Sequence, residues 1–284
     1  MMSLLRWLGR RPLWLLHAVG ALLGRLAWWF SPTYRRRMRT NAALAGVDEA
    51  TLLGAVPEAG RMIAELPRLW LRPVNESVAD PVRWEGDTWL AGLLERAQGV
   101  VLLTPHLGSF EVAAQAYAER FGSRWPLTAL YRPAKHAFFR EIEETARARP
   151  GLATAPASLA GVRQLLRALK AGQTVGMLPD QVPPAGMGVW APFFGRRAYT
   201  MTLAARLARQ SGAALAVLWC ERLPQGQGYV VRAQPLAEPP APDASDDAAA
   251  AAINRSMEAV ILQCPTQYLW GYHRYKGPRA EGHA

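Results

Sequence analysis

The sequence predicts an α/β protein, with a mixed and largely parallel sheet flanked by helices and an N-terminal apolar helix that anchors the chain to a membrane. Three observations support this class. Short apolar runs alternate with segments of helical periodicity, the run Val100–Leu103 has no polar alternation, and Leu13–Phe30 is almost wholly apolar. A strand without polar alternation suits a sheet covered on both faces. The 284 residues, 50% of them hydrophobic, are enough for a large buried core.

The N-terminal apolar segment Leu13–Phe30 would extend about 27 Å as a helix, which is close to the minimum for crossing a bilayer. His17 and Arg25 inside it, and arginines on both sides, disfavour a simple spanning helix. A cleaved signal is also disfavoured, because Arg25 interrupts the apolar run and bulky aromatic residues replace the small residues of a cleavage site. We expect residues 1–40 to form an uncleaved anchor in or through the cytoplasmic leaflet, with a buried core helix as the alternative. The flanking arginines are Arg6, Arg10, Arg11, Arg35, Arg36, Arg37 and Arg39.

Residues 41–284 are expected to form the α/β domain. The segment from Arg36 to Arg72, which leads from the anchor into this domain, has a helical pattern with expected breaks at Pro57, Pro67 and Pro73. Strands are expected at Val100–Leu103, Leu127–Tyr131, Thr174–Leu178 and Ala213–Trp219, with Gly228–Ala233 as an edge strand. Helices are expected after Ser109, from Ser158 to Gly172, from Thr200 to Gly212, and from about Asp247 to Cys264.

The charge of the chain points to anionic partners. Thirty-three basic and 22 acidic side chains give a net charge of +11. The 11 tryptophans favour a membrane among those partners, since amphipathic rings prefer the boundary between water and lipid. No nucleic-acid-binding motif is present, and we expect no nucleic-acid partner. The two cysteines and five histidines lack the spacing of metal ligands, so we expect no metal site and no cofactor.

The turn after the run Val100–Leu103 carries the candidate chemistry. Pro105 and Gly108 break the chain there, which places His106 in the turn and Glu111 in the first turn of the next helix. A carboxylate in that place could hold one imidazole nitrogen and leave the other to take a proton from a hydroxyl. His106 and Glu111 are therefore the candidate base and its orienting acid. The alternative is a histidine that serves only as a satisfied polar group.

Other strand ends supply further candidates, because sites in α/β proteins gather at the carboxyl ends of parallel strands. Arg132 and Asp180 each follow a predicted strand. Arg132 or backbone N–H groups near Gly108 are candidate donors to an oxyanion, and Arg196 with Arg197 are candidates for binding lipid phosphates. The alternatives are a solvated arginine, an aspartate that caps a turn, and plain surface charge.

The motif HLGSFE (His106 to Glu111) resembles the signature of glycerolipid-type acyltransferases, in which an acid follows a histidine after four residues. Four more segments, in the same order, resemble the bacterial lipid A late acyltransferases within that superfamily, and the likeness covers nearly the whole chain. These segments are ELPRLWLRP (65–73), YRP (131–133), LPDQ followed by APFFGRRAYT (191–200), and PTQYLWGYHRYKGPR (265–279).

The resemblance implies a glycerolipid acyltransferase-like fold and an enzyme at the cytoplasmic face of the bacterial inner membrane. It implies transfer of a fatty acyl chain from acyl carrier protein to a hydroxyl of a lipid A precursor, an anionic glycolipid. His106 would be the base and Glu111 its orienting acid, with Arg132 and Asp180 linked to activity or substrate binding. No GxSxG motif or plausible catalytic cysteine is present, so we expect direct transfer.

Two alternatives to this function remain open. One is a related acyltransferase that acts on a lysophospholipid, an ornithine lipid or another glycolipid, because the base requires only a hydroxyl. The other is a membrane-attached binding protein without catalysis.

Overall fold

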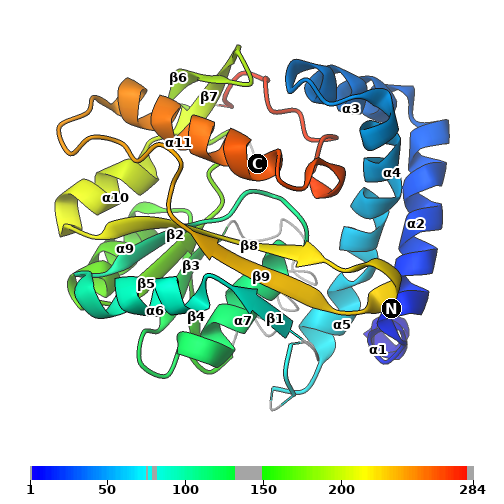
Figure 1. Ribbon diagram of the computed structural model, residues 1–284, viewed down its shortest axis with the longest axis horizontal. Coiled ribbons are helices and arrows are strands. Elements are labelled where there is room, and N and C mark those ends of the chain that lie inside the picture. The colour runs from blue at the N-terminus through cyan, green and yellow to red at the C-terminus, as the bar shows by residue number, and fades with distance from the viewer. Residues whose placement is uncertain (1, 75, 79–81, 132–148, 280–284) are drawn as a thin grey trace.

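The expected sheet is present and has both strand directions. Among the residues that the computed structural model describes, 2–74, 76–78, 82–131 and 149–279, seven strands form one sheet in the order β1-β9-β8-β2-β5-β3-β4 (Figure 1). All neighbouring strands are parallel except β8 and β9. The strands are β1 Val82–Glu85, β2 Val100–Leu103, β3 Leu127–Tyr131, β4 Leu152–Pro156, β5 Thr174–Met177, β8 Ala214–Arg222 and β9 Tyr229–Gln234.

Helices cover both faces of this sheet. On β2, Val101 and Leu103 pack with residues of α9, α10 and α11, whereas Val100 and Leu102 pack with residues of α6 and α7. All four side chains are buried, which confirms the prediction of a strand covered on both sides. The helices are α6 Asp87–Arg96, α7 Phe110–Phe121, α9 Leu159–Lys170, α10 Leu203–Ser211 and α11 Asp246–Ile261.

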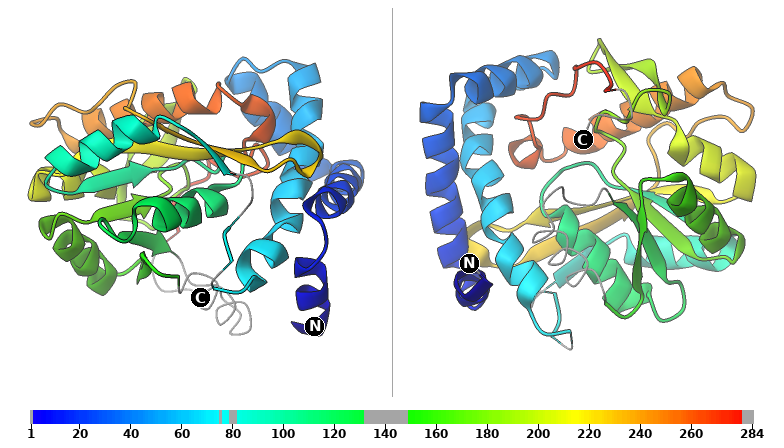
Figure 2. Two further views of the ribbon diagram at one scale, coloured as in Figure 1. Left: turned by 60° about the horizontal axis from the view of Figure 1, so that its bottom comes forward. Right: turned by 180° about the vertical axis from the view of Figure 1, so that it is seen from behind.

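The N-terminal helices stand beside the sheet, with α2 outermost (Figure 2). The predicted apolar helix is α2, and it runs antiparallel to α4. Gly20 and Gly24 of α2 face Gly60 of α4 so closely that a Cβ on any of them would collide with the opposite backbone. The helices are α1 Met2–Gly9, α2 Leu13–Phe30, α3 Pro32–Leu44, α4 Glu49–Ala64 and α5 Leu66–Leu71. Trp28 and Met38 belong to the same core cluster as residues of the sheet. The boundary expected at residue 40 stays a prediction.

Three expected elements differ in the structure. Thr200 does not open a helix but lies in β7, part of a hairpin formed by β6 Gly188–Phe193 and β7 Arg196–Met201, because its buried hydroxyl is held by Asn254 and Arg274. Pro57 does not end a helix, since it lies inside α4, which is packed along α2. The strand expected at the edge, β9, has β1 as its outer neighbour.

Candidate active site

His106 lies in the turn between β2 and α7, where the sequence places it. The strand ends at Leu103, and Pro105 prevents its continuation. Gly108 has a φ of +60°, and a side chain at this position would collide with the carbonyl group of Cys220. These breakers hold the imidazole at the carboxyl end of the central strand.

Asp180 is the carboxylate that contacts this imidazole. Its Oδ1 lies 2.7 Å from Nδ1 of His106, and its Oδ2 accepts a hydrogen bond of 2.9 Å from the backbone N–H of His106. The two residues meet because β2 and β5 are parallel neighbours with Leu103 opposite Met177. Each functional residue follows its strand by three positions, so both lie at the same edge of the sheet.

The surroundings of Asp180 favour its ionised form. Burial alone would raise the pKa of this carboxyl, but the charge and hydrogen bonds of His106, together with the charge of Arg274, lower it below its ordinary value. An ionised carboxylate only accepts hydrogen bonds, so Nδ1 of His106 carries the proton. The other ring nitrogen, Nε2, is then the basic atom.

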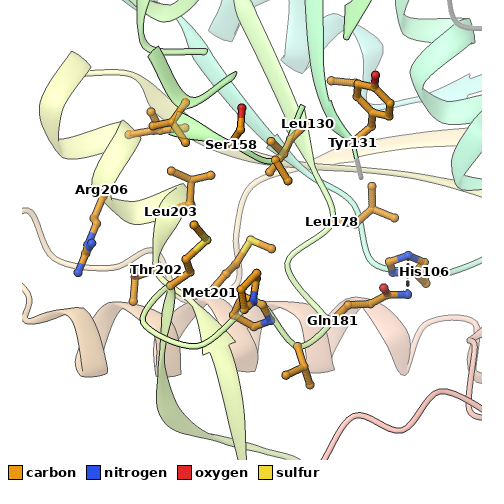
Figure 3. Close-up of a pocket in the computed structure, with 18 of the residues that line it drawn as sticks. His106, Leu130, Tyr131, Ser158, Leu178, Gln181, Met201, Thr202, Leu203 and Arg206 are labelled. Carbon is orange, nitrogen blue, oxygen red and sulfur yellow. Dashed lines mark hydrogen bonds between the residues drawn. The ribbon is translucent and has the colours of Figure 1, made fainter. Parts of the chain in front are cut away.

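Nε2 of His106 is 2.9 Å from the side-chain nitrogen of Gln181, the residue directly after Asp180 (Figure 3). The ring of Phe110 meets the imidazole edge at a centroid distance of 5.1 Å. Sequence reasoning singled out the segment LPDQ but assigned no role to Gln181. Its position one residue after a strand-end aspartate was the available signal.

A cavity of about 590 Å³ opens beside His106. Figure 3 shows His106 and Gln181 at one end and Arg206 of α10 at the other. Its volume is in the range of sites that bind small molecules, and most of its wall is apolar. The apolar lining includes Leu130, Val162, Leu178, Met201, Leu203 and Leu207.

The remaining candidates occupy different places. Glu111 is buried in the first turn of α7 and lines the same cavity, while the two ring nitrogens of His106 have Asp180 and Gln181 as partners. The backbone N–H of Gly108, a candidate oxyanion donor, is already donated to the carbonyl of Gln267 at 3.0 Å.

Of the basic candidates, only Arg196 and Arg197 belong to the described part of the chain, and they lie apart from His106 and Asp180. Arg132 lies outside the described residues. Arg196 and Arg197 are exposed at the start of β7 and do not line the cavity, and the guanidinium of Arg196 lies over the ring of Tyr275. Their expected role at lipid phosphates stays a prediction.

A buried ionic cluster lies behind the turn. Arg222, at the end of β8, donates two hydrogen bonds to the carboxylate of Glu65, at 2.8 and 2.9 Å, and one of 3.1 Å to the carbonyl of Gly108. His17 of α2 and the hydroxyl of Tyr229 also contact Glu65. Burial opposes the ionised form of Glu65, but the charge and hydrogen bonds of Arg222 prevail and lower its pKa to about 2. This cluster joins α2 to the backbone of the active-site turn.

Neither cysteine is suited to act as a nucleophile. Both cysteines are buried and unpaired, and burial raises the pKa of Cys220 well above its usual value and that of Cys264 to about 11. A thiol that stays protonated is a poor nucleophile. No group of three or more potential metal ligands occurs in the described part of the chain.

The fold and the site together define an α/β protein with a histidine–aspartate pair at the mouth of an apolar cavity. The sequence model described as "Bacterial lipid A biosynthesis acyltransferase" matches residues 3–277, and the chain belongs to this family. Family membership supports acyl transfer to lipid A.

Individual relatives agree with this assignment. A lipid A biosynthesis lauroyltransferase of Escherichia coli K12 is 26% identical, with 98% of this chain and 93% of the relative aligned. A lipid A biosynthesis palmitoleoyltransferase of the same organism is 28% identical, over 96% of this chain and 91% of the relative. A lipid A biosynthesis acyltransferase of Shigella flexneri has the same identity and coverage.

Proposed function

We propose that the protein transfers a fatty acyl chain from acyl carrier protein to a hydroxyl of a lipid A precursor. The observation that carries this proposal is the position of His106, whose Nδ1 is held by Asp180 while Nε2 faces an apolar cavity. That arrangement provides a base next to a place for a long acyl chain. Family membership supports lipid A as the acceptor class.

The transfer needs a hydroxyl that loses its proton as it attacks the thioester carbonyl. Nε2 of His106 takes this proton, and the negative charge of Asp180 stabilises the imidazolium that forms. The tetrahedral intermediate then collapses with cleavage of the carbon–sulfur bond. The proton on Nε2 passes to the departing thiolate, so the histidine returns to its starting state.

The apolar cavity is the proposed site of the acyl chain. Burying a methylene group contributes about 0.8 kcal/mol, so an extended chain gains binding energy along the wall formed by α9, β7 and α10. Direct transfer is the proposed route, because the sequence has no GxSxG motif for a serine nucleophile and neither Cys220 nor Cys264 lines this cavity. A covalent acyl-enzyme trapped on the wild-type protein would contradict this route.

Membrane attachment is proposed to occur through α2, and the helix is proposed to lie on the inner membrane rather than cross it. Its length and a mean hydropathy of 1.3 satisfy the requirements for a spanning helix, but 33% of it is buried in the protein. His17 is paired with Glu65, and Gly20 and Gly24 are pressed against α4. Only the opposite face is open to lipid. Its large exposed residues are Trp14, Val19, Leu22, Leu23, Trp29 and Phe30.

The arginines that flank α2 would then meet lipid phosphates at the cytoplasmic face. Arg6 and Arg10 precede the helix, and Arg36 and Arg37 follow it on α3. This placement would bring the catalytic domain to the membrane leaflet in which the precursor resides.

The experiment that tests the function is acyl transfer from acyl carrier protein thioesters of several chain lengths to a tetra-acylated lipid A precursor with the inner sugar acid. We expect wild-type activity and a loss of about 100-fold or more in His106→Ala. Activity on a lysophospholipid, an ornithine lipid or another glycolipid instead would retain the enzyme and correct the acceptor. Inert wild-type protein that still binds these lipids would favour a binding protein.

A further inference from the structure

Gln181 makes a contact that the proposed chemistry does not yet use. Its side-chain nitrogen lies 2.9 Å from Nε2 of His106 (Figure 3). Because Asp180 fixes the proton on Nδ1, Nε2 has a free electron pair and the amide of Gln181 donates to it. The amide therefore occupies the position that an attacking hydroxyl must take.

The backbone N–H groups of the turn that carries His106 are already used within the protein and are not available to the oxygen of the reacting carbonyl. The four consecutive N–H groups of residues 106–109 all donate to acceptors inside the protein, at distances between 2.7 and 3.0 Å. Their acceptors are the side chain of Asp180 and the carbonyls of Pro105, Gln267 and Cys220. A tetrahedral intermediate needs a donor at its oxygen, and the side-chain amide of Gln181 is a donor that lines the same cavity as His106.

We propose that Gln181 is a catalytic residue that donates to the oxyanion during acyl transfer, an inference that rests on the proposed function. In the free protein its amide caps Nε2 of His106. When the acceptor hydroxyl takes that place, the displaced amide turns to the thioester oxygen, which lies next to the attacked carbon.

Charge and protons balance over the steps of this reaction. The hydroxyl oxygen bonds to the carbonyl carbon, its proton moves to Nε2, and the carbonyl oxygen becomes an oxyanion that accepts from the amide of Gln181. Collapse breaks the carbon–sulfur bond and the proton on Nε2 goes to the thiolate. Nε2 is then unprotonated again, and the amide returns to it.

The surroundings of Gln181 suit this movement. Its side chain is half-buried and lines the cavity, so it contacts both the imidazole and the space for substrate. The residues on either side are held in place, since the side chain of Asp180 is hydrogen-bonded to His106 and the backbone N–H of Val182 donates to the hydroxyl of Tyr272 at 3.0 Å. A movable amide between neighbours that are held in place allows the donor to change partners without a change of fold.

The test compares Gln181→Ala and Gln181→Glu with the wild type in the acyl transfer assay. Losing one oxyanion donor should lower kcat by about 100-fold or more, with little change in KM for the acyl donor. Gln181→Glu has nearly the same shape, but its carboxylate only accepts, so it should not restore activity. Gln263→Ala, which alters an exposed glutamine after α11, is the matched control.

A second measurement separates a donor to the transition state from a structural residue. A phosphonate analogue of the tetrahedral intermediate should bind Gln181→Ala more weakly by the same factor as the loss in kcat/KM. A thioether analogue, which has no carbonyl oxygen, should bind both proteins equally. Equal loss of affinity for the two analogues would mean a structural role and overturn the inference.

Other results also separate this inference from the proposed function. If His106→Ala is inactive but Gln181→Ala retains kcat within about threefold, Gln181 is not the donor and the base remains. If Gln181→Glu matches the wild type, a donor is not needed and the inference is wrong. If His106→Ala remains fully active, both the base and the oxyanion donor are overturned.

Discussion

Asp180 holds His106 at two points, with Oδ1 at Nδ1 of the ring and Oδ2 at the backbone N–H of the same residue. The first contact sets the tautomer and the second fixes the chain that carries the ring. The side chain of Asp180 is almost fully buried and that of His106 is 15% exposed. A pair with this geometry keeps the basic nitrogen aimed at the cavity before any substrate arrives.

Replacing Asp180 by asparagine should lower the transfer rate by about 10³-fold to 10⁴-fold, because an amide can donate to Nδ1 and so favour the wrong tautomer. Initial rates at saturating donor test this, with unchanged thermal unfolding as the check on folding. Asp243→Asn, in an exposed loop, should retain full activity. A rate for Asp180→Asn within tenfold of the wild type would mean that Asp180 does not orient the base.

Glu111→Gln should have a smaller effect than Asp180→Asn. Glu111 lines the cavity, but Asp180 and Gln181 are the partners of the ring nitrogens of His106, so its contribution is expected in substrate binding. The expected result is a higher KM for the acceptor and a kcat within about tenfold of the wild type. A loss of kcat in Glu111→Gln equal to that in Asp180→Asn would instead support the orienting role that the sequence suggests.

How well the sequence predicts a feature of the site depends on how far apart in the chain the residues involved are. The strand Val100–Leu103, its breakers and the position of His106 follow from local composition, and all are present. Local composition does not predict which carboxylate contacts the imidazole. Glu111 is five residues away in the chain and Asp180 is 74 residues away. The pairing of β2 with β5, which are separated by β3 and β4 in the chain, brings Asp180 to the imidazole.

Helix α2 is a second case in which local sequence does not predict a contact between distant residues. Hydropathy identifies Leu13–Phe30 as apolar, but it does not distinguish a side that faces lipid from a side that faces protein. His17 looks like a defect in a membrane helix. In the structure it meets Glu65, which is 48 residues later in the chain, inside a cluster that no local pattern reveals.

Glu65→Gln should destabilise the protein by about 3–5 kcal/mol, because it leaves the buried charge of Arg222 without its main partner. Urea unfolding measures this change. The matched control is Glu49→Gln, whose ion pair with Arg39 is about half exposed and should contribute about 1 kcal/mol or less. Equal effects of the two substitutions would show that burial does not amplify the Glu65 pair.

Low pH should destabilise the folded protein by protonating the carboxylate of Glu65. The pKa of Glu65 is about 2 in the folded protein and 4.5 ordinarily, so its stabilising contribution is complete above the ordinary pKa and is lost as pH falls towards 2. We expect the free energy of unfolding to fall between about pH 5 and pH 2 in the wild type. The slope should be shallower in Glu65→Gln, although Asp180, whose pKa is also lowered, still contributes. Parallel slopes in the two proteins would exclude Glu65 as a cause.

Membrane binding should depend on the exposed face of α2 and not on its mere presence. Deleting α2 would also remove His17 from Glu65, so point substitutions make the cleaner test. Trp29 and Phe30 are 64% and 81% exposed, and replacing both by serine should reduce flotation with anionic vesicles by about tenfold or more, at unchanged thermal stability.

The control for that experiment is Leu262→Ser, a 48% exposed apolar residue after α11, far from α2 in the chain. It should float as the wild type does, because membrane contact is assigned to one helix face. Vesicles of zwitterionic lipid should bind the wild type more weakly than anionic ones, since the arginines beside α2 lose their phosphate-rich partner surface. Flotation of the Trp29 and Phe30 double variant at wild-type levels would place the membrane contact elsewhere on the protein.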